Sequence, residues 1–309
     1  MINRSDYIET FSLKSSFSSE AWSILGEIEQ RIKRKVESIG VPLKEWDVEI
    51  YRGVLTGCND AFIITSIKRN EILNNCTTEE ERQKTAELIR PILRGRDIKR
   101  YSYDFADQYI IATFPSKQYN IDEYQSLKSY LLSFGREKLE QTGKEYMING
   151  ETVKARKKTN NKWFETQDSI SYWDEFSKPK IIYPNMTKFL PFVYDTSGLM
   201  TNQKCFVITG KHLGYLTAFF NSSLFKFCFA DKFPELQGKT RELSKIFMEE
   251  IPILKIDSLD EQKIDELIQD IQSEYSVEKA KQIDKFIFDL YHLSFEEQSY
   301  IGFIDYGEK

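Results

Sequence analysis

The periodicity of apolar residues changes along the chain, and this change limits the possible folds more than any other feature. Between residues 48 and 209, short apolar runs and period-two alternation predict several strands, such as 180–183 and 205–209, with helical patterns between them. After residue 257, apolar positions recur every three or four residues and form two helical stripes. Strands and helices show no regular βαβ rhythm. We therefore expect an α+β fold with a mixed or antiparallel sheet and a C-terminal helical hairpin.

The distribution of charge follows the same division. The chain has 43 basic and 48 acidic side chains, a net charge of −5, which argues against an indiscriminate polybasic binder. Residues 257–309 contain 14 acidic and 5 basic residues, a net charge of −9, so the first 256 residues have a net charge of +4. We expect an N-terminal helical linker (1–45), an α+β domain (46–256) and an acidic helical segment (257–309).

Local signals predict individual elements within this outline. Ser18 or Ser19 is expected to cap a first helix that ends at Gly40. Residues 48–54 and 61–65 are expected to pair as a hairpin through a Thr56-Gly57 turn. The remaining expectations are a helix that starts with a capping box at Thr77, a basic loop over 90–100, a helix over 122–142, a polar basic stretch over 144–162 and an apolar helix over 213–227.

The sequence lacks the usual signatures of catalysis. It has no G-x-G, no Walker-type G-x-x-x-x-G-K-[ST] loop (Gly238-Lys239-Thr240 follows Phe233 where that loop needs its first glycine) and no adjacent prolines, so nucleotide-binding loops and the Asn/Asp-Pro-Pro-aromatic loop of amino-methyltransferases are absent. Its four cysteines and two histidines do not form a zinc pattern. Asp97-Ile98-Lys99 and Glu261-Gln262-Lys263 have the spacing of a nuclease metal site but do not lie on predicted strand edges. We expect a chain that is not an enzyme and binds no metal, with a metal-dependent endonuclease as an alternative.

Two clusters of basic residues remain as candidate binding sites. The first contains Arg94, Arg96, Lys99 and Arg100, whose side chains suit phosphate oxygens or a guanine edge. The alternative is that Asp97 holds Arg94 or Arg96 in an internal pair. The second cluster combines cations, which can hold phosphates, with asparagines, whose side chains can read adenine. The alternative interpretation of this segment is a mobile charged surface loop without a binding role. The members of the second cluster are Lys154, Arg156, Lys157, Lys158, Asn160, Asn161 and Lys162.

Several sequence boxes resemble the TaqI-like C-terminal specificity domain of adenine-specific DNA methyltransferases and type II restriction-modification enzymes. Thr56-Gly57-Cys58-Asn59-Asp60-Ala61-Phe62-Ile63 is similar to the family's T-G-x-N-x-A-F box, and residues 89–101 are similar to its P-hydrophobic-x-R-G-x-D-I-x-R-Y box. Further boxes follow in order: Trp163-Phe164-Glu165, Lys178 to Pro184, Leu216 to Ser222 with Phe220 in place of the usual leucine, and Ile283-Asp284 to Leu293.

This resemblance implies a target-recognition domain that binds double-stranded DNA sequence-specifically. It also implies a methyltransferase catalytic domain as partner, in cis or in trans. S-adenosylmethionine and Mg²⁺ are implied only for the parent enzyme, which is either a methyltransferase alone or one fused to an endonuclease. To the two basic clusters we add Thr56, Asn59 and Lys188 as expected DNA contacts. A protein-interaction scaffold is a further alternative. Without a signal peptide or membrane span, a cytoplasmic protein is expected.

Overall fold

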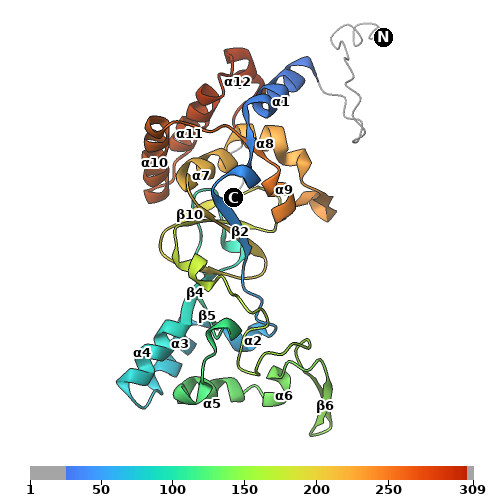
Figure 1. Cartoon of the computed structure of the whole chain (residues 1–309), viewed down its shortest axis with the longest axis vertical. Coiled ribbons are helices and arrows are strands. Elements are labelled where there is room, and N and C mark those ends of the chain that lie inside the picture. The colour runs from blue at the N-terminus through green and yellow to red at the C-terminus, as the bar shows by residue number, and fades with distance from the viewer. Residues whose placement is uncertain (1–25, 305–309) are drawn as a thin grey trace, which may run out of the picture. The chain divides into compact units, whose positions relative to one another are not determined.

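The computed structural model describes residues 26–304, which form two compact units (Figure 1). The described part of the first unit comprises residues 26–48, 188–190 and 214–304, and the second unit comprises 49–187 and 191–213. Helices and mostly antiparallel strand pairs occur together, which confirms the α+β class. The expected domain boundary after residue 256 lies inside the first unit, and the division into three domains stays a prediction.

The second unit contains two four-stranded sheets and a separate two-stranded ribbon. The first sheet has the order β10 (Val193–Asp195), β8 (Lys180–Pro184), β12 (Cys205–Gly210), β2 (Val48–Arg52). The second has the order β11 (Met200–Thr201), β4 (Ile89–Leu93), β5 (Gln108–Ile111), β3 (Ile63–Thr65). The ribbon pairs β6 (Glu145–Ile148) with β7 (Glu151–Lys154). Among these pairings β11 and β4 are parallel, whereas β4, β5 and β3 pair antiparallel.

Side chains that alternate along the strands build two cores in this unit. Ile110 and Ile92 belong to a buried cluster that also includes Ile182 and Val207 of the first sheet. The adjacent Ile111 belongs to a second cluster, which lies against the helices, because successive side chains of a strand point to opposite faces. The helices of this unit are α2 (Asn59–Phe62), α3 (Ser66–Asn74), α4 (Glu79–Leu88), α5 (Gln125–Leu132) and α6 (Arg136–Leu139).

Two expectations about this unit are wrong. The segments 48–54 and 61–65 do not form a hairpin: β2 pairs with β12, β3 pairs with β5, and α2 occupies part of the expected returning strand. The expected basic loop over 90–100 begins as strand β4. Pro91 stands opposite Tyr109 of β5, but the Ala112 N–H bond to the Leu88 carbonyl sets the alternation of this ladder and makes 91/109 a pair without ladder bonds. On its other side β11 pairs only with Ile92 and Leu93, so no ladder bond depends on the missing N–H group.

Helix α4 shows how local chemistry sets a helix start. Its N-cap is Thr78, whose hydroxyl accepts a hydrogen bond from the Glu81 backbone N–H at 3.1 Å. The Glu81 carboxylate accepts in return from the backbone N–H of Thr77 at 2.9 Å. The helix start is therefore displaced by one residue from the expected one, the return bond reaches Thr77 instead of the N-cap, and the helix ends at Leu88, before Pro91.

Helices dominate the first unit. They are α1 (Glu27–Ile39), α7 (Leu213–Asn221), α8 (Ser223–Phe229), α9 (Lys245–Glu249), α10 (Ser258–Ser273), α11 (Val277–Leu290) and α12 (Phe295–Ile301). The expected C-terminal hairpin is present as α10 and α11, and α12 is an additional helix. The N-cap expected at Ser18 or Ser19 lies outside the described residues. Among residues 26–304, no helix combines the length and the apolar composition that a membrane span needs.

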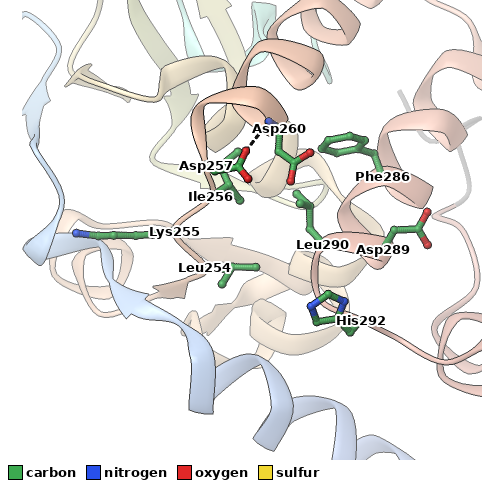
Figure 2. A pocket seen from close by; sticks show the side chains of 9 residues that line it. All are labelled: Leu254, Lys255, Ile256, Asp257, Asp260, Phe286, Asp289, Leu290 and His292. Atoms are coloured by element: carbon green, nitrogen blue, oxygen red, sulfur yellow. Dashed lines mark hydrogen bonds between the residues drawn. The ribbon is translucent and has the colours of Figure 1, made fainter.

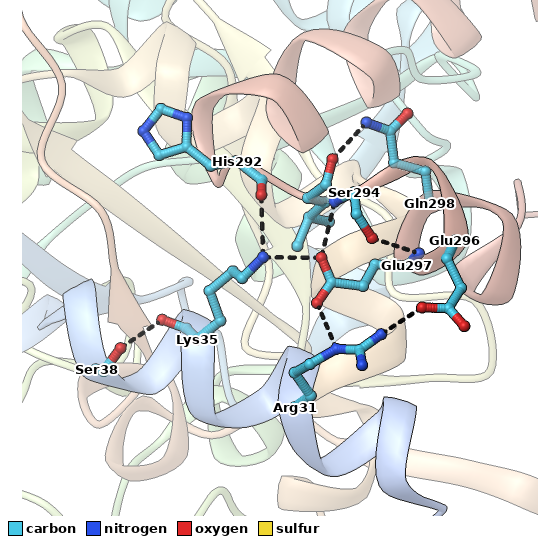
Figure 3. A network of polar contacts seen from close by, with 9 residues as sticks. Arg31, Lys35, Ser38, His292, Ser294, Glu296, Glu297 and Gln298 are labelled. Carbon is cyan, nitrogen blue, oxygen red and sulfur yellow. Dashed lines mark hydrogen bonds and ion pairs between the residues drawn. The ribbon is translucent and has the colours of Figure 1, made fainter.

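A buried carboxylate joins α1 to α12 in the first unit (Figure 3). Glu297 is only 2 % exposed and accepts hydrogen bonds from Arg31 Nε at 3.0 Å and Lys35 Nζ at 2.8 Å. It also accepts from the backbone N–H of Ser294, the N-cap of α12, at 2.8 Å. Burial raises the pKa of Glu297, but the hydrogen bonds from Lys35, Ser294 and Arg31 outweigh it and lower this pKa to about 2.

Candidate nucleic-acid interface

Arg94 and Asp97 form an internal pair at the end of β4. The guanidinium of Arg94 donates from Nε and Nη2 to the two oxygens of Asp97, at 2.9 and 2.8 Å, and the Arg94 backbone N–H donates to the same carboxylate. Asp97 is 5 % exposed, and these hydrogen bonds raise the pKa of Arg94. The internal pair expected as the structural alternative is present for Arg94, it fixes the turn that follows β4, and it engages two of the three guanidinium nitrogens.

The other cations of the first cluster differ in their availability. Arg96 is exposed, and no hydrogen bond or ion pair joins its side chain to any of residues 26–304. Lys99 forms an ion pair with Asp104 at 3.2 Å. The guanidinium of Arg100 lies 5.5 Å from the centre of the Tyr101 ring. In this cluster Arg96 therefore offers the most accessible charge.

Arg156 lies in the interior and holds four backbone carbonyls. Its guanidinium donates to the carbonyl oxygens of Leu139, Thr56, Glu165 and Trp163, at distances between 2.7 and 2.8 Å. Arg156 is 4 % exposed, and burial lowers its pKa to about 10, so it stays charged at neutral pH. The expected DNA contact is replaced by a structural role, because every nitrogen of the fork already has a protein partner.

The expected polar contacts Thr56, Asn59 and Asn161 also have partners within the protein. The Thr56 hydroxyl is buried and donates to Asn59 Oδ1 at 2.7 Å, so this pair closes the turn before α2. Asn161 Nδ2 donates to the carbonyl oxygens of Thr166 and Gln167, at 3.2 and 2.9 Å. Asn59 remains exposed, whereas Thr56 and Asn161 shape the backbone and leave little to offer a ligand.

The remaining lysines of the second cluster lie on the surface of the second unit. Lys154, Lys157 and Lys158 are exposed, and their side chains form no hydrogen bond or ion pair with residues 26–304. Asn160 is exposed in the same way, and Lys162 lies 4.0 Å from the Glu165 carboxylate. Lys188 is exposed and belongs to the first unit, whereas this cluster belongs to the second.

Sequence reasoning missed the ribbon to which Lys154 belongs. The segment 144–162 was expected to be a polar stretch, yet it begins with the β6–β7 hairpin and a two-residue turn at Asn149 and Gly150. Both turn residues have positive φ, +49° and +85°, and Asn-Gly is the residue pair that favours such a turn. That dipeptide was the available signal. Lys144, exposed beside the ribbon, was missed with it.

The groups considered for metal-dependent chemistry have other contacts. Asp97 accepts from Arg94, and Lys99 pairs with Asp104. Lys263 pairs with Asp260 on α10 at 3.0 Å. Within residues 26–304, no group of three or more His, Cys, Asp or Glu side chains has the arrangement of a metal site, and the four cysteines are free thiols.

A pocket of the first unit is acidic (Figure 2). It is lined by Leu254, Lys255, Ile256, Asp257, Asp260, Phe286, Asp289, Leu290 and His292. Asp257 caps α10 by accepting from the backbone N–H groups of Leu259 and Asp260, at 3.0 and 2.9 Å. Three carboxylates against one lysine repel phosphate, so this pocket is a poor place for nucleic acid.

Comparison with known families identifies the fold that presents these residues. Residues 90–253 match the model of the TaqI-like C-terminal specificity domain. The chain belongs to this family. The resemblance deduced from the sequence boxes is thereby confirmed, and membership makes the chain a specificity domain.

Two solved structures are similar to this specificity-domain chain. One is the type IIG restriction endonuclease BpuSI, with 15% identity and a TM-score of 0.50 over 88% of this chain and 34% of the other. The second is the type IIL restriction-modification enzyme MmeI in complex with DNA, with 9% identity and a TM-score of 0.51 over 84% and 35%. At this identity the likeness establishes the fold alone. The chain spans about a third of either enzyme, and no curated protein matches it.

Proposed function

We propose that this chain is the part of a restriction-modification enzyme that recognises a specific sequence in double-stranded DNA. The observation that supports this most is the match to a specificity domain over residues 90–253. The exposed cations Arg96, Lys154, Lys157 and Lys158 supply phosphate contacts, because none of the described residues neutralises them. Arg94 and Arg156 hold the backbone that presents these cations.

In this proposal the chain itself is not catalytic. Methyl transfer to adenine, and cleavage if the parent enzyme has it, take place in a methyltransferase or nuclease domain that acts in cis or in trans. S-adenosylmethionine and Mg²⁺ are needed there and not by this chain. The chain covers only about a third of the two similar enzymes, which leaves room for such domains in a parent protein.

Binding of labelled duplexes by the full chain, measured at several salt concentrations, tests the proposal. Each phosphate contact releases counterions, so the logarithm of affinity should fall steeply with the logarithm of salt. The double variant Lys157→Ala/Lys158→Ala should reduce this slope by about two units, whereas Lys285→Ala, an exposed lysine on α11, should leave it unchanged. Absence of duplex binding, or binding that ignores salt, would contradict the proposal.

A further inference from the structure

The β6–β7 ribbon is a projection whose shape does not depend on a neighbouring sheet. Four residue pairs run from Glu145↔Lys154 to Ile148↔Glu151, and no further strand among the described residues pairs with them. An isolated two-stranded hairpin is marginally stable in water, so its rigidity must come from its base. There the ladder continues: the backbone N–H of Ala155 donates to Lys144, and that of Gly143 donates to Arg156.

The base of the ribbon is anchored in the interior of the second unit. The Arg156 backbone N–H donates to the Glu140 carbonyl at 2.9 Å, and its buried guanidinium holds residues of α6 and of the turn before α2. Gln141, 3 % exposed, donates to the carbonyls of Lys162, Glu165 and Thr166. The ribbon therefore starts from a fixed position, as a structure that reads a ligand must.

The two faces of the ribbon differ. On one face Tyr146, Ile148 and Val153 are partly buried, and the Tyr146 hydroxyl bonds to Thr142 Oγ1 at 3.1 Å. On the other face Met147 and its partner Thr152 are both exposed, and Met147 is 74 % exposed. An apolar side chain as exposed as that of Met147 contributes little to the stability of the fold, so Met147 is available for contact with a ligand.

The dimensions and charges of the ribbon fit the major groove of B-DNA, which is about 12 Å wide and about 8.5 Å deep and admits a two-stranded ribbon. Four residue pairs extend over about 13 Å, so the tip can reach the base edges while the base of the ribbon stays at the level of the phosphates. Lys144, Lys157 and Lys158 lie at that base, and all three are exposed.

We propose that the β6–β7 ribbon enters the major groove of the target duplex and reads base edges with residues 147–152. The inference rests on the proposed function and names its reading element. Asn149 at the turn offers a carboxamide that suits adenine, and Met147 offers an apolar surface that suits the thymine methyl group. Lys144, Lys154, Lys157 and Lys158 contact the flanking phosphates.

Selection from a randomised duplex library by the full chain, followed by salt titration on the selected duplex, tests this inference. Asn149→Gly removes the carboxamide and keeps a residue that accepts positive φ, and Met147→Ala shortens an exposed side chain. Met186→Ala, at another exposed methionine of the second unit, is the matched control. Thermal unfolding of each variant shows whether its fold is intact.

We expect the wild-type chain to select a DNA consensus sequence. In Asn149→Gly the base preference at one position of this consensus should fall about tenfold, and in Met147→Ala the preference at another position should fall similarly. Neither variant should change the salt slope. Met186→Ala should select the wild-type consensus. If both ribbon variants also select the wild-type consensus, while Lys157→Ala/Lys158→Ala still reduces the salt dependence of affinity, the inference is wrong and the proposed function stands. If the wild-type chain shows no salt-dependent duplex binding, the proposed function fails, and the inference fails with it.

Discussion

Buried polar side chains explain much of what the family boxes have in common with this chain. Thr56 closes the turn before α2, and Arg94 pairs with Asp97 after β4. Lys180, fully buried, pairs with Asp195, whose carboxylate also accepts from the backbone N–H of Leu199. Each of these residues satisfies groups that would be costly to bury alone. At the residue scale, the boxes therefore describe the framework of the recognition domain more than its contacts with DNA.

Replacement of Arg156 by lysine should destabilise the protein strongly. Arg156→Lys keeps the charge but cannot reach four carbonyl oxygens at once, so several buried acceptors lose their partner. We expect the free energy of unfolding to fall by about 3 kcal/mol, measured by urea denaturation. Lys157→Ala, at the exposed neighbour, should change it by no more than about 0.5 kcal/mol. Equal stability of Arg156→Lys and wild type would contradict the structural role.

Glu297 should make the first unit sensitive to acid. Its folded pKa of about 2 lies below the unfolded value of about 4.3, so its contribution is complete above about pH 4.5 and is lost as the pH falls towards 2. Two pKa units correspond to about 3 kcal/mol as an upper bound. Glu297→Gln should lower stability at pH 7 and flatten the pH dependence between 4.5 and 2, measured by urea unfolding at each pH. Glu296→Gln, at the exposed neighbour, should retain the wild-type pH profile.

At the scale of elements, a buried carboxylate fixes two helices of the first unit. Asp284 on α11 accepts from the backbone N–H and the hydroxyl of Ser223, at 2.7 and 2.5 Å, at the N-terminus of α8. Ser222 caps the same helix through its hydroxyl, which accepts from the Phe225 backbone N–H. Negative charge at a helix N-terminus is favourable, which explains an aspartate inside an otherwise apolar stripe.

Asp284→Asn should weaken the packing of α11 on α8. The substitution keeps the size of the side chain but replaces one acceptor oxygen by an NH₂ group that faces the Ser223 donors. We expect a loss of about 2 kcal/mol in the free energy of unfolding. Asp289→Asn, at an exposed position of the same helix, is the control and should be close to neutral. A similar small effect for both variants would exclude the capping role of Asp284.

At the scale of the whole molecule, the acidic C-terminal segment and the exposed lysines of the candidate site belong to different units. Residues 257–304, with a net charge of −8, lie in the first unit together with the acidic pocket, whereas the exposed lysines of the 144–162 segment lie in the second. Repulsion from the acidic helices opposes non-specific attraction to DNA. We therefore expect DNA to bind through the second unit, with modest overall affinity.

The full chain should show neither methyl transfer nor DNA cleavage. It lacks the glycine-rich and Pro-Pro sequence boxes, and the residues of its two metal-like triplets have other partners. Incubation with labelled S-adenosylmethionine and substrate duplex should leave the DNA unlabelled, and a plasmid with Mg²⁺ should stay supercoiled. Label in the DNA, or nicking that resists removal of trace contaminants, would show that the chain is an enzyme.

Much of the fold is predictable from the sequence alone, because periodicity and capping act between near neighbours. The strands around 180–184 and 205–210, the helix before Pro91 and the two acidic helices all follow from such signals. The pairing of strands is different. β2 and β3 follow each other closely but join separate sheets, because their partners β12 and β5 come from distant segments.

The role of each cation was decided only by the tertiary structure. Arg156 and Lys157 are adjacent in one basic run, yet the first is buried and the second exposed. The difference arises because the Arg156 guanidinium donates to the carbonyl groups of Thr56, 100 residues away in the sequence, and Leu139, 17 residues away. Composition and spacing show how many cations a segment has. Whether a cation is buried or paired depends on groups far away in the sequence, and this decides whether the cation is available to DNA.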